Sequence, residues 1–211
     1  RYLPALLQAV ENQTYSPIEV IVVDNVSDDG TISVAQEWGA RVMTNPIPAN
    51  VNMSRNMGAD ASGGDYLMFI DSDMVPEHQA IEASVLGLQN GADIVYPNRI
   101  STDDHIISIV RVIGGWIDPN TGFTAGGGYI GTRRDVFEAI GGWDETCNPL
   151  TGEGGEDGKN FIHRASMIGY QVKIMRNIYV GASDRRRHSE GFHFLEPCKQ
   201  RAVRNIGRVG Q

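Results

Sequence analysis

The apolar residues of this chain repeat with two different periods, which predicts a protein built from both helices and strands. One face of an amphipathic helix is predicted near the start by the spacing of Leu3, Leu6, Leu7 and Val10. Residues 18–23 and 66–70 are instead short and nearly continuous apolar runs, too short for ordinary helices. Runs of this kind are typical of strands buried in a parallel sheet.

The same two periods, together with the positions of Gly and Pro, predict the remaining elements. Further strands are expected at residues 41–43, 93–96, 106–113 and 129–131. Further helices are expected at residues 31–38, 54–61, 77–88, 135–140 and 160–168, with Pro76 suited to the first turn of the third of these. This alternation favours an α/β fold in one domain, with a mostly parallel central sheet that is mixed at one edge and flanked by helices.

Acidic residues stand where two of the predicted strands end. Asp24 follows residues 18–23, and Asp71 and Asp73 follow residues 66–70. If the chain stays extended, Asp71 and Asp73 leave the same face at the edge where open α/β sheets bind ligands. Two carboxylates this close repel each other unless a cation lies between them, which favours a divalent metal site. The alternative is that Asp71 is a turn residue and Asp73 caps a helix that starts near Pro76.

Composition and charge narrow the classes of function. The formal net charge of -8 argues against a general nucleic-acid-binding protein, because no broad basic surface is available to neutralise phosphates. Basic residues gather mainly in one cluster, which consists of Arg185, Arg186, Arg187 and His188. No apolar run is long enough to span a membrane and we recognise no signal peptide, so we expect a cytoplasmic protein, at most peripheral to a membrane. Cys147 and Cys198 are expected to be free thiols.

A second acidic focus lies at residues 152–157, directly before a predicted helix. Glu156 and Asp157 fall in or beside its first turn, where the helix dipole favours negative charge, so both residues could simply cap the helix. The other interpretation is catalytic, because a carboxylate that is ionised at neutral pH can accept a proton from an attacking hydroxyl.

Four segments taken together resemble a known family. They are EVIVVDNVSDDGT, SRNMGADASGGDYLMFIDSDM, GGGYIGTRRDVFEAIGGWDE and GGEDGKNFIHRASMIGYQV, which begin at residues 19, 54, 126 and 154. In this order and with this spacing they resemble the family 2 glycosyltransferases of the GT-A fold. The resemblance covers roughly residues 1–180 and implies an inverting enzyme that moves sugar from a nucleoside-diphosphate sugar, such as a UDP-sugar, to a saccharide or lipid-linked acceptor.

The resemblance also implies roles for individual residues. Asp24 would contact the nucleotide base, Asp71 the ribose or sugar, and Asp73 an Mn²⁺ or Mg²⁺ ion on the diphosphate. Asp157 would be the catalytic base, with Glu156 beside it as an acceptor or donor-sugar contact. Residues expected to line the donor and acceptor pockets are Arg55, Asn56, Gly58, Gly127 and Gly128. His188 is a further candidate for a metal or diphosphate contact, although a solvated basic turn is an alternative for that cluster.

The resemblance divides the chain into a nucleotide-sugar half at residues 1–97, an acceptor and catalytic half at 98–178, and a tail at 179–211. Family members usually open with a strand that packs against the nucleotide base, and nothing of that kind precedes Arg1, so we expect a strand to be missing there. Trp116 and Trp143 could stack on sugar or fill the core. Two other functions stay open, namely a sugar-phosphate nucleotidyltransferase and a non-catalytic nucleotide-sugar binding module.

Overall fold

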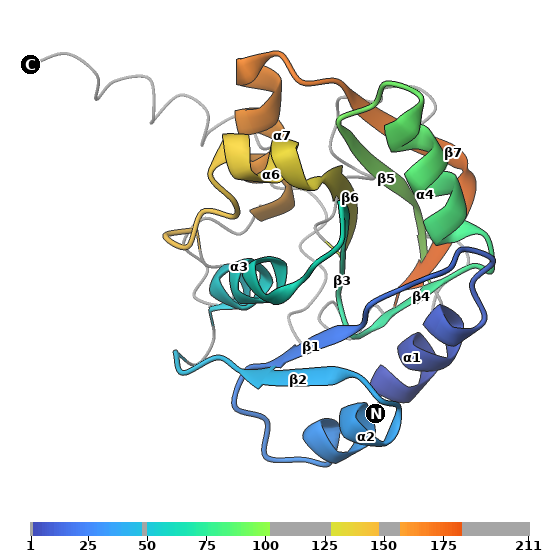
Figure 1. Ribbon diagram of the computed structural model, residues 1–211, viewed down its shortest axis with the longest axis vertical. Helices are drawn as coiled ribbons and strands as arrows, with labels where there is room; N and C mark the ends of the chain where they lie inside the picture. The colour runs from blue at the N-terminus through green and yellow to red at the C-terminus, as the bar shows by residue number, and fades with distance from the viewer. Residues whose placement is uncertain (1, 48–49, 102–127, 148–156, 183–211) are drawn as a thin grey trace, which may run out of the picture.

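Helices flank two β-sheets in the computed structural model of this protein, which describes residues 2–47, 50–101, 128–147 and 157–182 (Figure 1). The smaller sheet pairs β1 (Ile21–Asp24) in parallel with β2 (Arg41–Thr44). It is covered by α1 (Leu3–Glu11) and α2 (Thr31–Glu37). The predicted apolar face of the first helix is confirmed, because Leu3, Leu6 and Leu7 are its buried residues and pack with Ala35 of α2.

The larger sheet has five strands in the order β3-β6-β5-β7-β4. These strands are β3 (Tyr66–Ile70), β4 (Met74–Pro76), β5 (Ile94–Ser101), β6 (Tyr129–Arg133) and β7 (Val172–Ala182). Because β6 is antiparallel to both β3 and β5, and β5 is parallel to β7, the strands β3, β5 and β7 run in one direction. The two strands that run in the opposite direction are β6, inside the sheet, and β4, at its edge. Antiparallel strands were expected at one edge only, and that expectation is wrong.

Alternate residues of the strands face two separate layers of helices. Leu67 and Phe69 point to the main core, together with residues of α3 (Val51–Ala61), α6 (Arg134–Ile140) and α7 (Asp157–Ile168). Tyr66 and Met68 pack instead with Leu88 of α4 (Ala80–Gln89). This period of two is what a strand imposes on its side chains.

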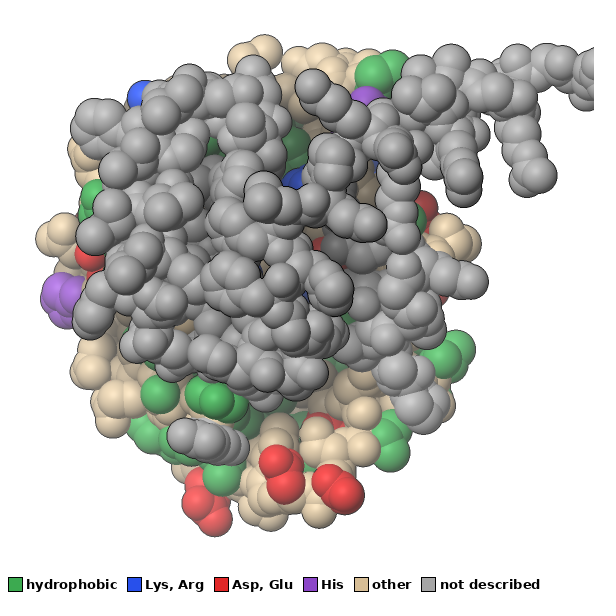
Figure 2. All heavy atoms as spheres, turned by 180° about the vertical axis from the view of Figure 1, so that it is seen from behind, with side chains coloured by type: hydrophobic (Ala, Val, Ile, Leu, Met, Phe, Trp, Pro, Cys, Tyr) green, Lys and Arg blue, Asp and Glu red, His purple; other side chains and the backbone are tan. Residues whose placement is uncertain are grey.

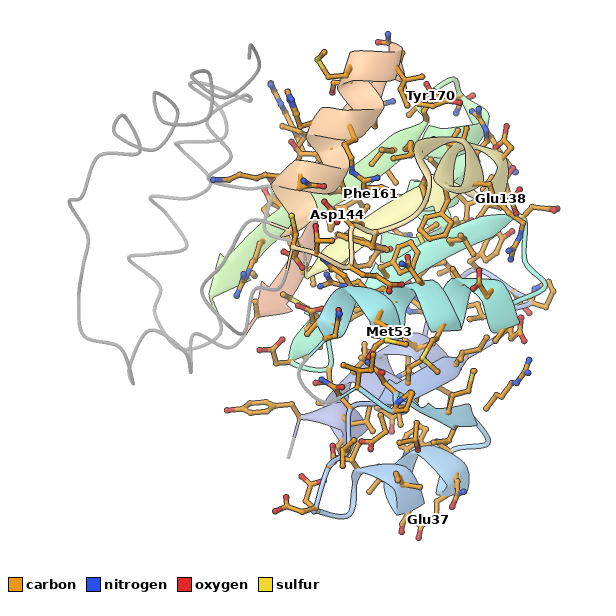
Figure 3. The ribbon with its side chains drawn as sticks, turned by 90° about the vertical axis from the view of Figure 1, so that its left-hand side faces the viewer. Glu37, Met53, Glu138, Asp144, Phe161 and Tyr170 are labelled. Atoms are coloured by element: carbon orange, nitrogen blue, oxygen red, sulfur yellow. The ribbon has the colours of Figure 1, made fainter. Side chains whose placement is uncertain are left out.

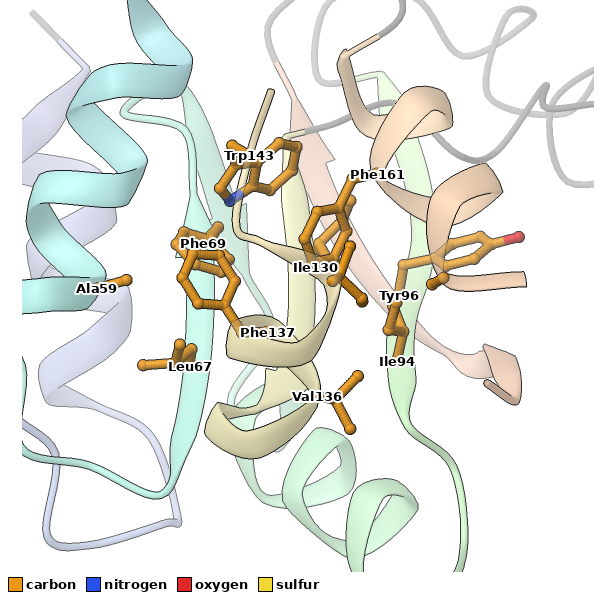
Figure 4. Close-up of a cluster of buried hydrophobic side chains, with 12 residues drawn as sticks. Ala59, Leu67, Phe69, Ile94, Tyr96, Ile130, Val136, Phe137, Trp143 and Phe161 are labelled. Carbon is orange, nitrogen blue, oxygen red and sulfur yellow. The ribbon is translucent and has the colours of Figure 1, made fainter. Parts of the chain in front are cut away.

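Aromatic rings dominate the main core (Figure 4). The ring of Trp143 stacks on that of Phe161 with a centroid separation of 4.6 Å, and it meets Phe69 edge-on at 5.3 Å. Trp143 is 2% exposed, so it fills the core rather than presenting a face to a sugar. Truncating such a ring to Ala in a close-packed core costs about 3–5 kcal/mol.

Two sequence-based expectations need correction in this region. Pro76 does not start a helix but ends the edge strand β4, where its missing N–H is tolerated, and α4 begins later at Ala80. The interpretation of Asp73 as the cap of a helix near Pro76 is therefore wrong. The eleven-residue strand β7 was not predicted. The strand expected at 106–113 lies outside the described residues.

The strands β1 and β3 belong to different sheets and do not pair, but their corresponding ends lie near each other. At their amino ends, the backbone N–H of Gly63 donates to the Glu19 carboxylate at 2.9 Å. At their carboxyl ends, Arg55 of the helix between them reaches Asp71 at 2.9 Å, and the residue after β1, Asn25, lines the same cavity as Asp71. The carboxyl ends of both strands thus lie near one cavity, but β1 and β3 belong to two sheets and not to the single central sheet that was expected.

A cavity of about 800 Å³ includes the space between these two strands, which we call the β1–β3 slot, and extends to Asp71, Asp73 and Asp157. Its walls include Leu3, Leu6, Leu7 and Val10 of α1 on one side and Ser54, Gly58 and Ala59 of α3 on the other. The strand edges that face it are unpaired within the described residues. The carbonyls of Asp24 and Asp65 accept hydrogen bonds from the residues that follow β2 and β6. Because successive residues of a strand direct their backbone groups to opposite sides, those of Val23, Tyr66 and Met68 face the slot.

Two observations concern basic side chains on one face and membrane-spanning helices among the described residues. On the face seen in Figure 2, the coloured Lys and Arg side chains are scattered rather than gathered into a patch. Among the described helices, none is both long enough and apolar enough to cross a membrane.

Candidate functional site

Asp71 is held at the carboxyl end of β3 by a close contact with the neighbouring chain. Its backbone N–H donates to the carbonyl of Gly128 at 2.8 Å. A Cβ at Gly128 would lie 1.8 Å from the Met74 methyl group and 3.5 Å from a carboxylate oxygen of Asp71, so a larger residue here would require the end of the Met74 side chain to move. The Asp71 side chain remains one-third exposed, at 33%, and lines the cavity together with Ser72 and Asp73.

Arg55 joins two candidate carboxylates that are far apart in the sequence. Its Nη2 donates to Asp71 at 2.9 Å, and its Nη1 donates to both Asp157 and the amide oxygen of Asn52. The guanidinium also lies 4.4 Å from the centre of the Trp143 ring. Burial opposes the charge of Arg55, but the two carboxylates outweigh it and the pKa of Arg55 is raised.

Asp157 occupies the first turn of α7 and divides its two oxygens between two partners. Oδ1 accepts from the backbone N–H of Gly158 at 2.8 Å, and Oδ2 accepts from Arg55. The expected helix-end position is therefore confirmed, yet the same side chain also faces the cavity. Capping and a role in the site are compatible for this residue.

The turn that follows α6 is pinned to α3 by two asparagines. Asn56 donates to the Trp143 carbonyl at 2.9 Å and accepts from the Trp143 N–H at 2.8 Å. Asn52 donates to the carbonyls of Asp144 and Cys147 at 2.8 and 2.6 Å. Figure 3 shows α3, which carries Met53, beside the turn at Asp144. Asn56 therefore supports the site from behind and is not part of the cavity wall, whereas Arg55 and Gly58 are.

Asp24 presents an unsatisfied oxygen at the end of β1. The side chain is 3% exposed, and its Oδ2 accepts from the N–H of Ser27 at 2.9 Å, while Oδ1 has no hydrogen-bond partner. Close by, Val26 has a φ of +60°, which is unfavourable for a β-branched residue. Unpaired buried oxygens and strained loops of this kind concentrate at ligand sites.

Arg99 is a site residue that sequence reasoning missed. It lies on β5, and its side chain lines the same cavity as Asp71 and Asp157. Its buried Nε has no hydrogen-bond partner, and no ion pair of Arg99 occurs among the described residues. The available signal was a lone cation three residues beyond the strand predicted at residues 93–96, which on its own is common on protein surfaces.

The described residues fit a divalent metal in donor chemistry. Asp71 and Asp73 offer carboxylate oxygens to one cavity, which are the ligands that Mg²⁺ and Mn²⁺ prefer. No cluster of three or more metal-binding side chains occurs in the described ranges. Mg²⁺ commonly takes one or two carboxylates and completes its shell with water and substrate phosphates, so two carboxylates suffice.

Several predicted site residues cannot be placed. Those that lie outside the described residues are Trp116, Gly127, Glu156, the cluster Arg185, Arg186, Arg187 and His188, and also Cys198. Cys147 is described and is a free thiol, as expected, and burial raises its pKa.

Solved structures with the same fold include two proteins in complex with nucleotide sugars. TarS 1–349 of S. aureus in complex with UDP-GlcNAc matches with a TM-score of 0.67 and 15% identity, over 90% of this chain and 58% of that one. The mannosyltransferase PcManGT of Pyrobaculum calidifontis, in complex with GDP-Man and Mn²⁺, matches with a TM-score of 0.62 and 18% identity, over 85% and 53%. At this identity the matches establish the fold, and they confirm the expected α/β GT-A class.

Curated relatives and a family profile agree with this fold. The glycosyltransferase AglE of Haloferax volcanii is 35% identical over 44% of this chain and 35% of its own length. The glycosyltransferase GlyG of Streptococcus pneumoniae is 28% identical over 49% and 36%. The chain thus spans about a third of the length of these relatives. The profile of Glycosyl transferase family 2 matches residues 1–141, more than half of the 211 residues, and the chain therefore belongs to this family.

Proposed function

We propose that this protein transfers a sugar from a nucleoside-diphosphate sugar to a hydroxyl of a saccharide or lipid-linked acceptor, with inversion and with the help of Mn²⁺ or Mg²⁺. The products would be cell-surface polysaccharides or glycoconjugates. The observation that carries this proposal is one cavity lined by Asp71, Asp73 and Asp157, with Arg55 and Arg99 among them. UDP-sugars are the donors proposed first.

The proposed chemistry assigns different tasks to the carboxylates. Asp157 accepts the proton of the acceptor hydroxyl as that hydroxyl attacks the anomeric carbon, on the face opposite the departing diphosphate. A carboxylate has about four lone-pair positions, so Asp157 can accept this proton while it retains Gly158 and Arg55 as partners. A metal ion held by Asp73, with Asp71 beside it, would offset the charge of the departing diphosphate.

A single displacement of this kind needs only one base. The diphosphate is a good leaving group when its charge is neutralised, so no second carboxyl group has to protonate it, in contrast to glycoside hydrolases. The reaction therefore inverts the anomeric configuration. In this proposal, Asp24 binds the nucleotide base through its unpartnered oxygen.

A non-catalytic nucleotide-sugar binding module is the second candidate. One observation favours it, namely that both oxygens of Asp157 already have partners within the protein. Membership of family 2 favours sugar transfer over this candidate and over nucleotidyl transfer.

The deciding experiment is a scan of UDP-, GDP- and dTDP-sugars with Mn²⁺ and a panel of saccharide and lipid-linked acceptors, in which released nucleotide and transferred sugar are both measured. Asp157→Asn should bind the donor normally while transfer falls by about 10²-fold or more, the scale for losing a general base. Glu156→Gln should be milder. Asp135→Asn is a matched control, because Asp135 is 72% exposed and remote from the cavity. Equal transfer by wild type and Asp157→Asn would move the base elsewhere, and binding without transfer would favour the binding module.

The β1–β3 slot belongs to the same proposal. An extended apolar segment joined ahead of Arg1 would pair with both strand edges, and its carboxyl end would reach the nucleotide-binding edge of the sheet. Leu3 already lines the slot at the first turn of α1, which leads through residues 12–17 back to the amino end of β1. The segment would run parallel to β1 and β3.

A further inference from the structure

The guanidinium of Arg55 occupies the space between two carboxylates from different elements. One arm of its planar fork bonds Asp71 at the end of β3, and the other bonds Asp157 at the start of α7. A guanidinium holds its N–H donors in a fixed plane, whereas the ammonium of Lys acts as a point charge. The distance between the two carboxylates is therefore set by the width of one rigid group.

The position of Arg55 is itself fixed from behind. Asn52 accepts from the same Nη1 at 2.9 Å, and its own amide is tied to the carbonyls of Asp144 and Cys147. The ring of Trp143 lies under the guanidinium at 4.4 Å, and the Arg55 side chain is 9% exposed. A side chain held on three sides in this way has little freedom to move.

We propose that Arg55 is a positioning residue, which holds the base Asp157 at a set place relative to the donor-binding carboxylate Asp71. This inference rests on the proposed function, and it differs from the donor-contact role that the family resemblance implies for Arg55. Arg55 acts on the reaction through Asp157. Misplacement of a catalytic group by about 1 Å can lower the rate on the order of 10²-fold.

The two ion pairs of Arg55 lead to a prediction about protein stability that can be tested without substrate. If Arg55 is replaced by Met, the carboxylates of Asp71 and Asp157 lose their shared cation in a largely buried place. Removing only one partner of such an ion pair is strongly destabilising, because the remaining charge is left without compensation. Neutralising Asp157 in the same chain should then relieve part of that loss.

Arg164 provides a matched control. It also lies over an aromatic ring of the core, 5.8 Å from the centre of Phe161, and it is tied to α7 and the turn after α6. Its hydrogen bonds, however, go to neutral oxygens of Asn160, Ile140 and Gly142. Replacing Arg164 by Met removes a half-buried arginine that has no carboxylate among its hydrogen-bond acceptors in the described residues.

The first experiment compares urea unfolding midpoints of wild type, Asp157→Asn, Arg55→Met and the double variant, and of the same set with Arg164→Met. Asp157→Asn should restore a measurable part of the midpoint lost in Arg55→Met and none of that lost in Arg164→Met. Additive losses in both sets would overturn the inference.

The second experiment measures transfer by Arg55→Lys and Arg55→Met. Both should lower kcat on the order of 10²-fold with a much smaller change in donor KM, because Lys keeps the charge but replaces the rigid planar fork that spans the two carboxylates with a single ammonium on a flexible stem. A wild-type kcat in Arg55→Lys would show that charge alone suffices and would overturn the positioning role. If wild type itself neither binds nor transfers a nucleotide sugar, the proposed function fails while the unfolding comparison still tests the ion pairs.

Discussion

The carboxylate of Asp24 accepts a hydrogen bond from the backbone N–H of Ser27 through one oxygen and leaves its other oxygen buried without a partner. A buried acceptor in this state normally loses on the order of 1–3 kcal/mol relative to a paired one. A ligand that donates to this oxygen would recover part of that free energy. The imide N–H of a uracil ring is such a donor.

Asp24→Asn should therefore weaken UDP binding by about 10-fold, because an amide cannot accept in the same way through both of its ends. Calorimetric titration of UDP measures this effect. Asp28→Asn changes an exposed carboxylate on the same loop and should leave the affinity unchanged. Equal losses in the two variants would point to the charge of the loop and not to Asp24.

Asp73 should be the main residue through which UDP binding depends on a metal ion. With Mn²⁺ present, Asp73→Ala should lower UDP affinity by at least about 10-fold, since the charges of diphosphate and carboxylates then repel without a bridging cation. In the presence of EDTA, wild type and Asp73→Ala should bind UDP equally weakly. Four equal affinities across the two proteins and two conditions would remove the metal from the mechanism.

Much of the fold could be predicted because the apolar periods are strong. The run at Tyr66–Ile70 is found as β3 with the expected ends, and the helix at Leu3 buries the expected face. The helix start predicted at Pro76 was wrong because proline suits a helix start and an edge strand equally, and only the neighbouring strand β7 decides between them. β7 itself was missed because polar residues such as Lys173 and Arg176 interrupt its apolar pattern, and its register shifts against β5.

The candidate site was predictable in its acidic part only. Asp24, Asp71 and Asp157 stand next to element ends, where a sequence pattern can indicate them. Spacing cannot reveal that Arg55 lies between Asp71 and Asp157, because that contact joins residues 102 positions apart. Arg99 gave only the weak signal of a lone cation beyond the predicted strand, since its importance comes from a buried Nε without a hydrogen-bond partner among the described residues, in a shared cavity.

Arg99 should recognise the charged part of the donor. Arg99→Met is expected to weaken UDP binding by about 10-fold and to leave uridine binding unchanged, because a hydrogen bond to a charged group contributes on the order of 1.5–3 kcal/mol. Calorimetry with UDP, UMP and uridine separates these contributions. Arg133→Met is the control, since Arg133 pairs with Asp93 and Asp135 outside the cavity. An equal loss for uridine and UDP would assign Arg99 a structural role.

Filling the β1–β3 slot with a strand should stabilise the protein and strengthen nucleotide binding. An apolar segment of about five residues, the length of β3, can be joined ahead of Arg1 by a short linker. It would satisfy the backbone groups of Val23 and Met68 and pack against the apolar side chains that line the slot.

The expected results are a higher urea unfolding midpoint, slower amide hydrogen exchange at Val23 and Met68, and tighter UDP binding. The control is the same segment with Pro at its central position, which removes a donor and cannot continue a ladder on both sides. If both segments stabilise the protein equally, the gain comes from apolar contact and not from strand pairing. If neither slows exchange in β1 and β3 together, the slot does not accept a strand, and the nucleotide site must be complete without one.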